Sequence, residues 1–123
     1  MKGRLLLLAA VIAVSGTVLV AQTSAMATPK LNGTVGPGFT ITLKKAGKKV
    51  TKLKAGKYTF VVADKSPIHN FVLEQESGGK FEKDITDVSQ TGTKTVTITL
   101  KKGKWKYYCM PHESSMFGFF TVT

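Results

Sequence analysis

The chain has 123 residues, with 18 Lys and Arg against 7 Asp and Glu and a formal net charge of +11. This length provides one modest hydrophobic core and excludes a large two-domain enzyme. The charge predicts attraction to acidic proteins, anionic polymers or membrane headgroups, and it carries no information about the fold. Because Cys109 is the single cysteine, an intramolecular disulfide is also excluded.

The N-terminal segment has the form of an export signal. Two basic residues precede an almost wholly apolar run, Leu5 to Ala21, and Ala25-Met26-Ala27 offers the small residues that a signal peptidase reads. We therefore expect residues 1–27 to be a signal peptide, cleaved before Thr28. Residues 28–123 then form one exported domain, which is secreted, periplasmic or attached to the cell surface.

A retained membrane anchor is the alternative, since the uncharged run from Leu5 to Pro29 is long enough to span a bilayer. Loss of the leader removes Lys2 and Arg4 and leaves 16 basic residues against 7 acidic ones. The exported domain therefore keeps a charge of +9.

From Leu31 onward the apolar residues repeat with a period of two, which predicts half-buried strands at 39–43 and 95–100. Further aromatic or β-branched runs at 58–63, 68–73, 105–109 and 117–122 are bounded by glycine-containing turns. Six or seven short strands favour an all-β sandwich or small barrel. The predicted core contains Phe39, Ile41, Phe60, Val96, Ile98 and Trp105.

Two features lie between these strands. The segments Leu53–Tyr58 and Leu100–Trp105 match in sequence, and in each a glycine, Gly56 or Gly103, precedes the aromatic residue that begins a predicted strand. We expect these glycines to form turns at two corners of one sandwich. The acidic stretch from 74 to 90 lacks clean alternation, so we expect a connecting loop with one helical turn around 81–88.

The residues able to bind a soft metal are few and concentrated. After the leader there are two histidines, one cysteine and two methionines, and four of these five fall between Cys109 and Met116. A thiolate, two imidazoles and a thioether suit copper that alternates between two oxidation states, with Cys and both His in a plane and Met as a long axial contact. The predicted ligands are His69, Cys109, His112 and Met116.

Each of these residues has an ordinary structural role when it is taken alone. A cysteine at a strand end is most often a small buried hydrophobe, and a methionine before a strand is most often part of the core. Zinc is the rival metal, but a thioether is a poor zinc ligand. With no other Cys or His after the leader, the combination favours copper.

The segments Tyr108-Cys109-Met110-Pro111-His112 and Pro67-Ile68-His69-Asn70, followed by Met116, resemble the cupredoxins, especially the plastocyanin, pseudoazurin and amicyanin group. The resemblance covers residues 31–123. It implies a two-sheet Greek-key β-sandwich of about seven strands with one type 1 copper ion at one end. It also implies that Asn70 ties the ligand loop to the His69 strand by hydrogen bonds, close to Met110 and Pro111.

This chain departs from the resemblance in two ways. Three residues separate His112 from Met116, whereas plastocyanin-like loops have four and amicyanin-like loops two. Position 110 is Met instead of a small hydroxyl residue, so the bond from Asn70 is either remade through the backbone or lost. Met110 alternates away from the metal on strand geometry and is a weak ligand candidate.

The resemblance implies a one-electron carrier rather than an enzyme, with the exposed edge of His112 as the exit. His112 has apolar neighbours, including Phe117, and Tyr108 offers a second route through the cysteine or is simply a half-buried aromatic residue. Two alternatives use the same fold. One is a protein that stores or delivers copper, and the other is a copper-free scaffold or adhesion module.

We expect a monomer that binds no nucleic acid and exchanges electrons with an acidic redox partner, or that associates with an anionic cell surface or membrane headgroups. Seven clustered lysines are the candidate docking residues, with His112 at the centre of the contact. A solvated strand face is the alternative role for them. They are Lys44, Lys45, Lys48, Lys49, Lys52, Lys54 and Lys57.

Overall fold

A computed structural model of the chain describes residues 10–21 and 27–123. The basic start of the predicted leader and most of its cleavage motif lie outside these residues, so the leader and the domain boundary at Thr28 stay predictions. Residues 10–21 and 27–29 are exposed and have no regular secondary structure. Within the two described ranges, no helix has the length and apolar character needed to cross a membrane.

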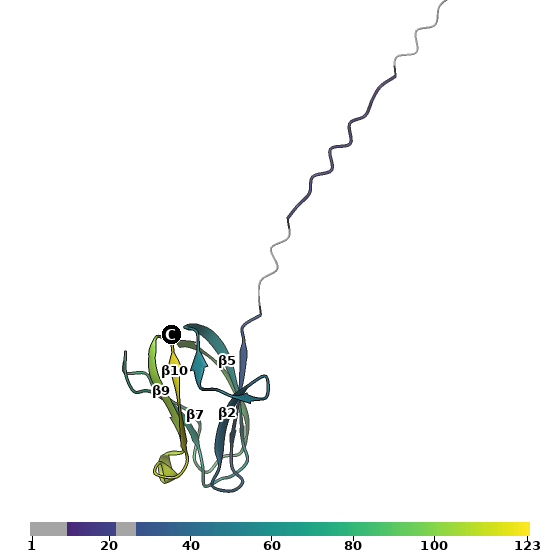
Figure 1. Cartoon of the computed structure of the whole chain (residues 1–123). Coiled ribbons are helices and arrows are strands. Elements are labelled where there is room, and N and C mark those ends of the chain that lie inside the picture. Colours follow the sequence, from purple (N-terminus) through teal and green to yellow (C-terminus); the bar gives the residue numbers. More distant parts are fainter. Residues whose placement is uncertain (1–9, 22–26) are drawn as a thin grey trace, which may run out of the picture.

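The domain is a sandwich of two five-stranded sheets (Figure 1). The first sheet has the order β3-β2-β1-β5-β8 and the second β4-β10-β9-β6-β7. The pairs β1–β5 and β4–β10 are parallel, and the other pairs are antiparallel. The strands are β1 (Lys30–Val35), β2 (Ile41–Lys45), β3 (Lys48–Lys49), β4 (Lys52–Leu53), β5 (Gly56–Asp64), β6 (Phe71–Gln75), β7 (Glu82–Thr86), β8 (Gly92–Leu100), β9 (Gly103–Tyr108) and β10 (Phe117–Val122).

The core lies between the two sheets, and the period-two alternation of the sequence produces it. Phe60, Ile98 and Trp105 are buried, while Ile41 and Val96 pack against them from partly exposed positions. Because successive strand side chains point to opposite faces, strands such as β5 and β10 bury every second residue in this layer. The all-β sandwich predicted from the sequence is confirmed.

Phe39 was wrongly predicted to lie in the core, since 62% of its side chain is exposed. The turn Gly36-Pro37-Gly38 delays the start of β2 to Ile41, so Phe39 belongs to the loop before the strand and not to its inward face. The apparent alternation at 39–43 therefore combines one loop residue with a real strand.

The loop predicted for 74–90 is also wrong in part, because β6 extends to Gln75 and β7 occupies Glu82–Thr86. No helical turn forms around 81–88. β7 is an edge strand that pairs with β6, and its first three residues are charged and exposed. Such charges prevent the edge strand from pairing with a strand of another molecule. They also interrupt the hydrophobic alternation by which a strand is recognised in the sequence.

Strand directions define two ends of the sandwich. β5 starts at Gly56, beside the C-terminus, where the Ala55 amide donates to the Thr123 carbonyl at 2.9 Å. It ends at Asp64, which pairs with Val35 at the end of β1. We call the first end the distal end and the second the ligand end. Nine residues of strand separate them by about 26 Å.

Glycine begins two strands at the distal end. Gly56 opens β5 with φ of 151°, and Gly103 opens β9 with φ of 148°. These values lie in the region that side chains avoid. A side chain at position 103 would also collide with the Ser77 carbonyl. The two matching segments therefore share a glycine with positive φ at the first residue of the strand.

Candidate metal centre

The loop between β9 and β10 carries three of the four predicted ligands. Cys109 directly follows β9, and a short 3-10 turn, Met110–His112, comes next. The His112 amide donates to the Cys109 carbonyl at 3.1 Å, and the Met116 amide donates to the His112 carbonyl at 2.8 Å. The Cys109 amide donates to the Met116 carbonyl at 3.0 Å, which closes the loop on itself.

His69 reaches the same place from the turn between β5 and β6. The sequence predicted His69 to lie within a strand at 68–73, but the residue lies two positions before β6. Its side chain is fully buried. Its ring also approaches the β1–β2 turn, because a Cβ on Gly36 would sit 3.4 Å from the His69 Cδ2 atom. Glycine suits that position because its φ is 73° and because a Cβ would approach the Ser66 Cβ atom to 2.9 Å.

Three ligand atoms converge to a triangle. The two histidine Nδ1 atoms are 3.1 Å apart, and each lies 3.6 Å from the Cys109 Sγ atom. A metal ion in the plane of the three atoms, with bonds of about 2.0 Å to nitrogen and about 2.3 Å to sulfur as zinc makes with these ligand types, would require edges of about 3.5 and about 3.7 Å. Metal binding therefore needs only a small widening of the nitrogen pair.

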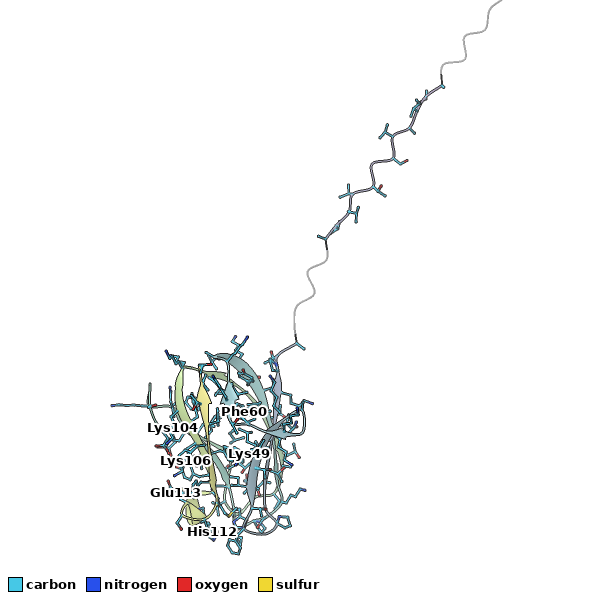
Figure 2. All side chains as sticks on the ribbon, viewed as in Figure 1. Lys49, Phe60, Lys104, Lys106, His112 and Glu113 are labelled. Carbon is cyan, nitrogen blue, oxygen red and sulfur yellow. The ribbon has the colours of Figure 1, made fainter. Side chains whose placement is uncertain are left out.

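Burial divides the ligands into an inner and an outer group. Cys109 and His69 have no exposed surface, and Met116 has 1%. His112 is half-buried and lies at the bottom of the sandwich in Figure 2. One ligand of four is thus accessible to another molecule.

Asn70 connects the histidine turn to the ligand loop. Its side-chain oxygen accepts a hydrogen bond of 2.7 Å from the Met110 amide, and the side chain is 1% exposed. The link is therefore made through the backbone, one of the two outcomes that the sequence left open. Met110 is 54% exposed and Pro111 is also exposed, so neither side chain enters the cluster.

Buried polar atoms gather at the same end. Among the described residues, the side-chain atoms that are buried without a hydrogen-bond partner are Asp64 Oδ2, His69 Nε2 and Asn70 Nδ2. All three lie on the segment 64–70. Since His69 Nδ1 faces the other ligands, its Nε2 atom carries the proton in the metal-ligating tautomer.

Phe39 is the site residue that sequence reasoning missed. Its ring centroid lies 5.3 Å from that of His69 and 4.9 Å from that of His112, with edge-to-face geometry at both. The two histidine rings are themselves 4.8 Å apart at 78°. Phe39 therefore covers the histidine pair from the exterior. The preceding Gly-Pro-Gly turn was the available signal that this residue leaves the strand pattern.

The outer face of the second sheet carries Tyr108 and Phe117. Tyr108 is 6% exposed and its hydroxyl donates to Glu82 Oε1 at 3.0 Å. Burial, then the hydrogen bond and charge of Glu82, raise the pKa of the Tyr108 phenol. Phe117 is 45% exposed and helps to line a hollow of about 530 Å³ with Lys106 and Glu113.

The structure distributes the predicted docking lysines over more than one surface. Lys44 and Lys49 line a hollow with Phe117, which begins β10 next to the ligand loop. All seven side chains are exposed, but Lys45, Lys54 and Lys57 line one hollow at the distal end together with Pro29. Lys45 and Lys48 pair in the β2–β3 hairpin, which also points away from the ligand end. In Figure 2 the labelled Lys49 lies above His112, at about mid-height of the sandwich.

Comparison with known proteins agrees with this centre. Residues 46–123 match the family model described as copper binding proteins of the plastocyanin/azurin family. Among curated protein sequences no significant match was found.

Solved structures of similar fold include blue copper proteins. A rusticyanin variant superimposes with a TM-score of 0.57 and 17% identity over 80% of each chain. Rusticyanin from Thiobacillus ferrooxidans gives 0.54 and 20% identity over 80% of this chain and 79% of that one. Auracyanin A, described as a "blue" copper protein of Chloroflexus aurantiacus, gives 0.53 and 18% identity over 79% of this chain and all of that chain, 100%. The chain therefore belongs to the plastocyanin/azurin family of copper-binding proteins, with His69, Cys109, His112 and Met116 as the residue cluster of a type 1 copper site.

Proposed function

We propose that this protein is an exported one-electron carrier that exchanges electrons through the His112 edge. Copper bound by the four residues would supply the redox couple, alternating between Cu(II) and Cu(I). The observation that carries the proposal is the triangle of His69, Cys109 and His112 ligand atoms, with edges of 3.1, 3.6 and 3.6 Å.

The surroundings of the triangle support a ligand set that changes little with oxidation state. His69 and Cys109 are fully buried in a close-packed sandwich. The Asn70–Met110 hydrogen bond and the closed ligand loop restrict backbone movement. Low reorganisation of ligands is what an electron carrier requires, whereas a delivery protein needs a site that opens.

The exterior around His112 suits brief contact with a partner. Phe39 and Met110 are 62% and 54% exposed, and Pro111 is exposed beside them. An apolar surface of this kind packs against another protein without fixed ion pairs. We propose an acidic redox partner, guided by the net positive charge, for a carrier that is itself a monomer.

Copper titration combined with voltammetry tests the proposal. Cu(II) is added to the purified protein, and we expect an intense visible thiolate-to-copper band together with a reversible one-electron wave. The band without a reversible wave would favour copper storage or delivery. Absence of both would favour the copper-free scaffold.

Met116→Gln tests the fourth ligand. We expect copper to stay bound and the reduction potential to fall, because an oxygen ligand stabilises Cu(II) more than Cu(I). The exposed Met110→Gln variant is the control and should leave the potential unchanged. An unchanged potential and spectrum in Met116→Gln would show that Met116 is not the axial ligand.

A further inference from the structure

The distal end of the sandwich is strongly basic. Lys45, Lys54 and Lys57 surround a hollow of about 500 Å³. Lys101 and Lys102 lie at the same end, because they follow Leu100, which pairs with Gly56. All five side chains are exposed.

These lysines have little acidic compensation. In the part of the chain that the structure describes, the one ion pair is Lys106 with Glu113, which lies beside the ligand loop. Glu76 lies at the distal end, where its amide donates to the Lys104 carbonyl, and Glu74 is close to it. The five lysines outnumber these two carboxylates. The positive charge of this end therefore remains available to an external anion.

The chain enters the fold at this same end. Pro29 lines the hollow and its carbonyl accepts a hydrogen bond from the Thr59 amide at 2.8 Å. The apolar run Leu5–Ala21 precedes this entry point in the sequence. In the alternative in which this run is retained as a membrane anchor, the distal end is the part of the domain nearest to the bilayer in the sequence.

We propose that the distal end binds anionic membrane headgroups and thereby points the copper end away from the bilayer. Each lysine near an anionic surface adds to binding, and the contributions sum when the lysines share one face. About 26 Å of β5 separates this face from the ligand end. A carrier held in this way keeps His112 free for its partner. The binding itself involves no copper, so it stands or fails independently of electron transfer.

The test uses residues 28–123, since every residue of the buried core lies between Leu31 and Val122. Sedimentation with phosphatidylcholine vesicles, with and without phosphatidylglycerol, measures binding at low and physiological salt. We expect binding to the anionic vesicles only, weakened by salt. The triple variant Lys45→Gln, Lys54→Gln, Lys57→Gln should bind at least tenfold more weakly.

A charge-matched variant separates the distal face from net charge. Lys65, Lys83 and Lys94 are exposed and lie away from the hollow, so replacing all three with Gln removes the same charge from other surfaces. We expect this variant to lose far less affinity. Equal losses in the two triple variants would overturn the proposal. So would equal binding to neutral vesicles, or binding to a soluble anionic polymer such as dextran sulfate without binding to vesicles.

Orientation is tested on the metal-free protein by modification of His112 with diethyl pyrocarbonate, followed by mass spectrometry. His112 is half-buried and His69 fully buried, so the reagent distinguishes them. We expect the same His112 rate in free and vesicle-bound protein. Protection of His112 on vesicles would place the copper end against the membrane and refute the proposed orientation.

Discussion

The two ends of the sandwich are built from the same strands but use polar residues in opposite ways. At the ligand end, His69 and Asn70 are buried and their positions are fixed by packing and by the bond to Met110. At the distal end, Lys54 and Lys57 are exposed and solvated. Buried polar groups depend on a specific geometry, whereas exposed charges act through their summed field. Substitutions should therefore have local, large effects at one end and small, additive effects at the other.

Cys109→Ser should have the largest effect. We expect complete loss of the visible band with copper, because the thiolate supplies the charge transfer, while far-UV circular dichroism still reports a β fold. Cys109 and Met116 belong to the buried core, but most of that core consists of apolar side chains such as Phe60, Leu100 and Trp105. Lys54→Gln is the distal control and should keep the full band. An unfolded Cys109→Ser protein would contradict a fold that is independent of the site.

Asn70→Ala should lower the free energy of unfolding by about 1–3 kcal/mol, because the Met110 amide loses its acceptor in a partly buried place. Chemical denaturation of the metal-free protein measures this. The matched control is Asn32→Ala on the exposed face of β1, which should change stability by less than about 0.5 kcal/mol. Equal effects at both positions would mean that the link between turn and loop contributes nothing specific.

Phe39→Ala should speed the transfer of copper to a chelator by about two- to tenfold. Edge-to-face aromatic contacts contribute about 0.5–1.5 kcal/mol, and here they cover the two histidine ligands. Phe119→Ala is the control, because Phe119 is 40% exposed and packs on Phe117 at a distance from the histidines. If both variants release copper at the same rate, Phe39 does not shield the site.

Tyr108→Phe should have the smallest effect and a distinct pH dependence. Near neutral pH it loses the bond to Glu82, which we expect to cost about 1 kcal/mol. The pKa of Tyr108 is raised in the folded protein, so above about pH 10 the unfolded chain ionises first and the wild type loses stability. A phenylalanine side chain cannot ionise, so the variant does not lose stability in this way. The difference in unfolding free energy between wild type and variant should therefore shrink above about pH 10.

Denaturation at pH 8 and pH 11 measures that difference. Burial also raises the pKa of Tyr107, so some decline at high pH should persist in the variant. A constant difference between the two proteins at both pH values would mean that Tyr108 ionises equally in the folded and unfolded states.

The sequence by itself determined the fold class and the ligands. The alternation in β5 and β8 specifies strands because the side-chain period of a strand is two. Cys109, His112 and Met116 are close in sequence, so a short turn suffices to bring them together. With His69 as the one remaining histidine, residue chemistry alone identified the set.

Only the tertiary structure decided what surrounds the ligands and where the charge lies. Phe39 covers the histidines because a turn places it against the loops of His69 and His112, both of which are distant from it in sequence. The lysines at 44–57 are near one another in sequence, yet the direction of β5 places Lys54 and Lys57 at the end opposite His112. Local pattern reports the period of a strand but not its direction or its neighbours, since these are set by the long-range pairing of strands and by the packing of the two sheets.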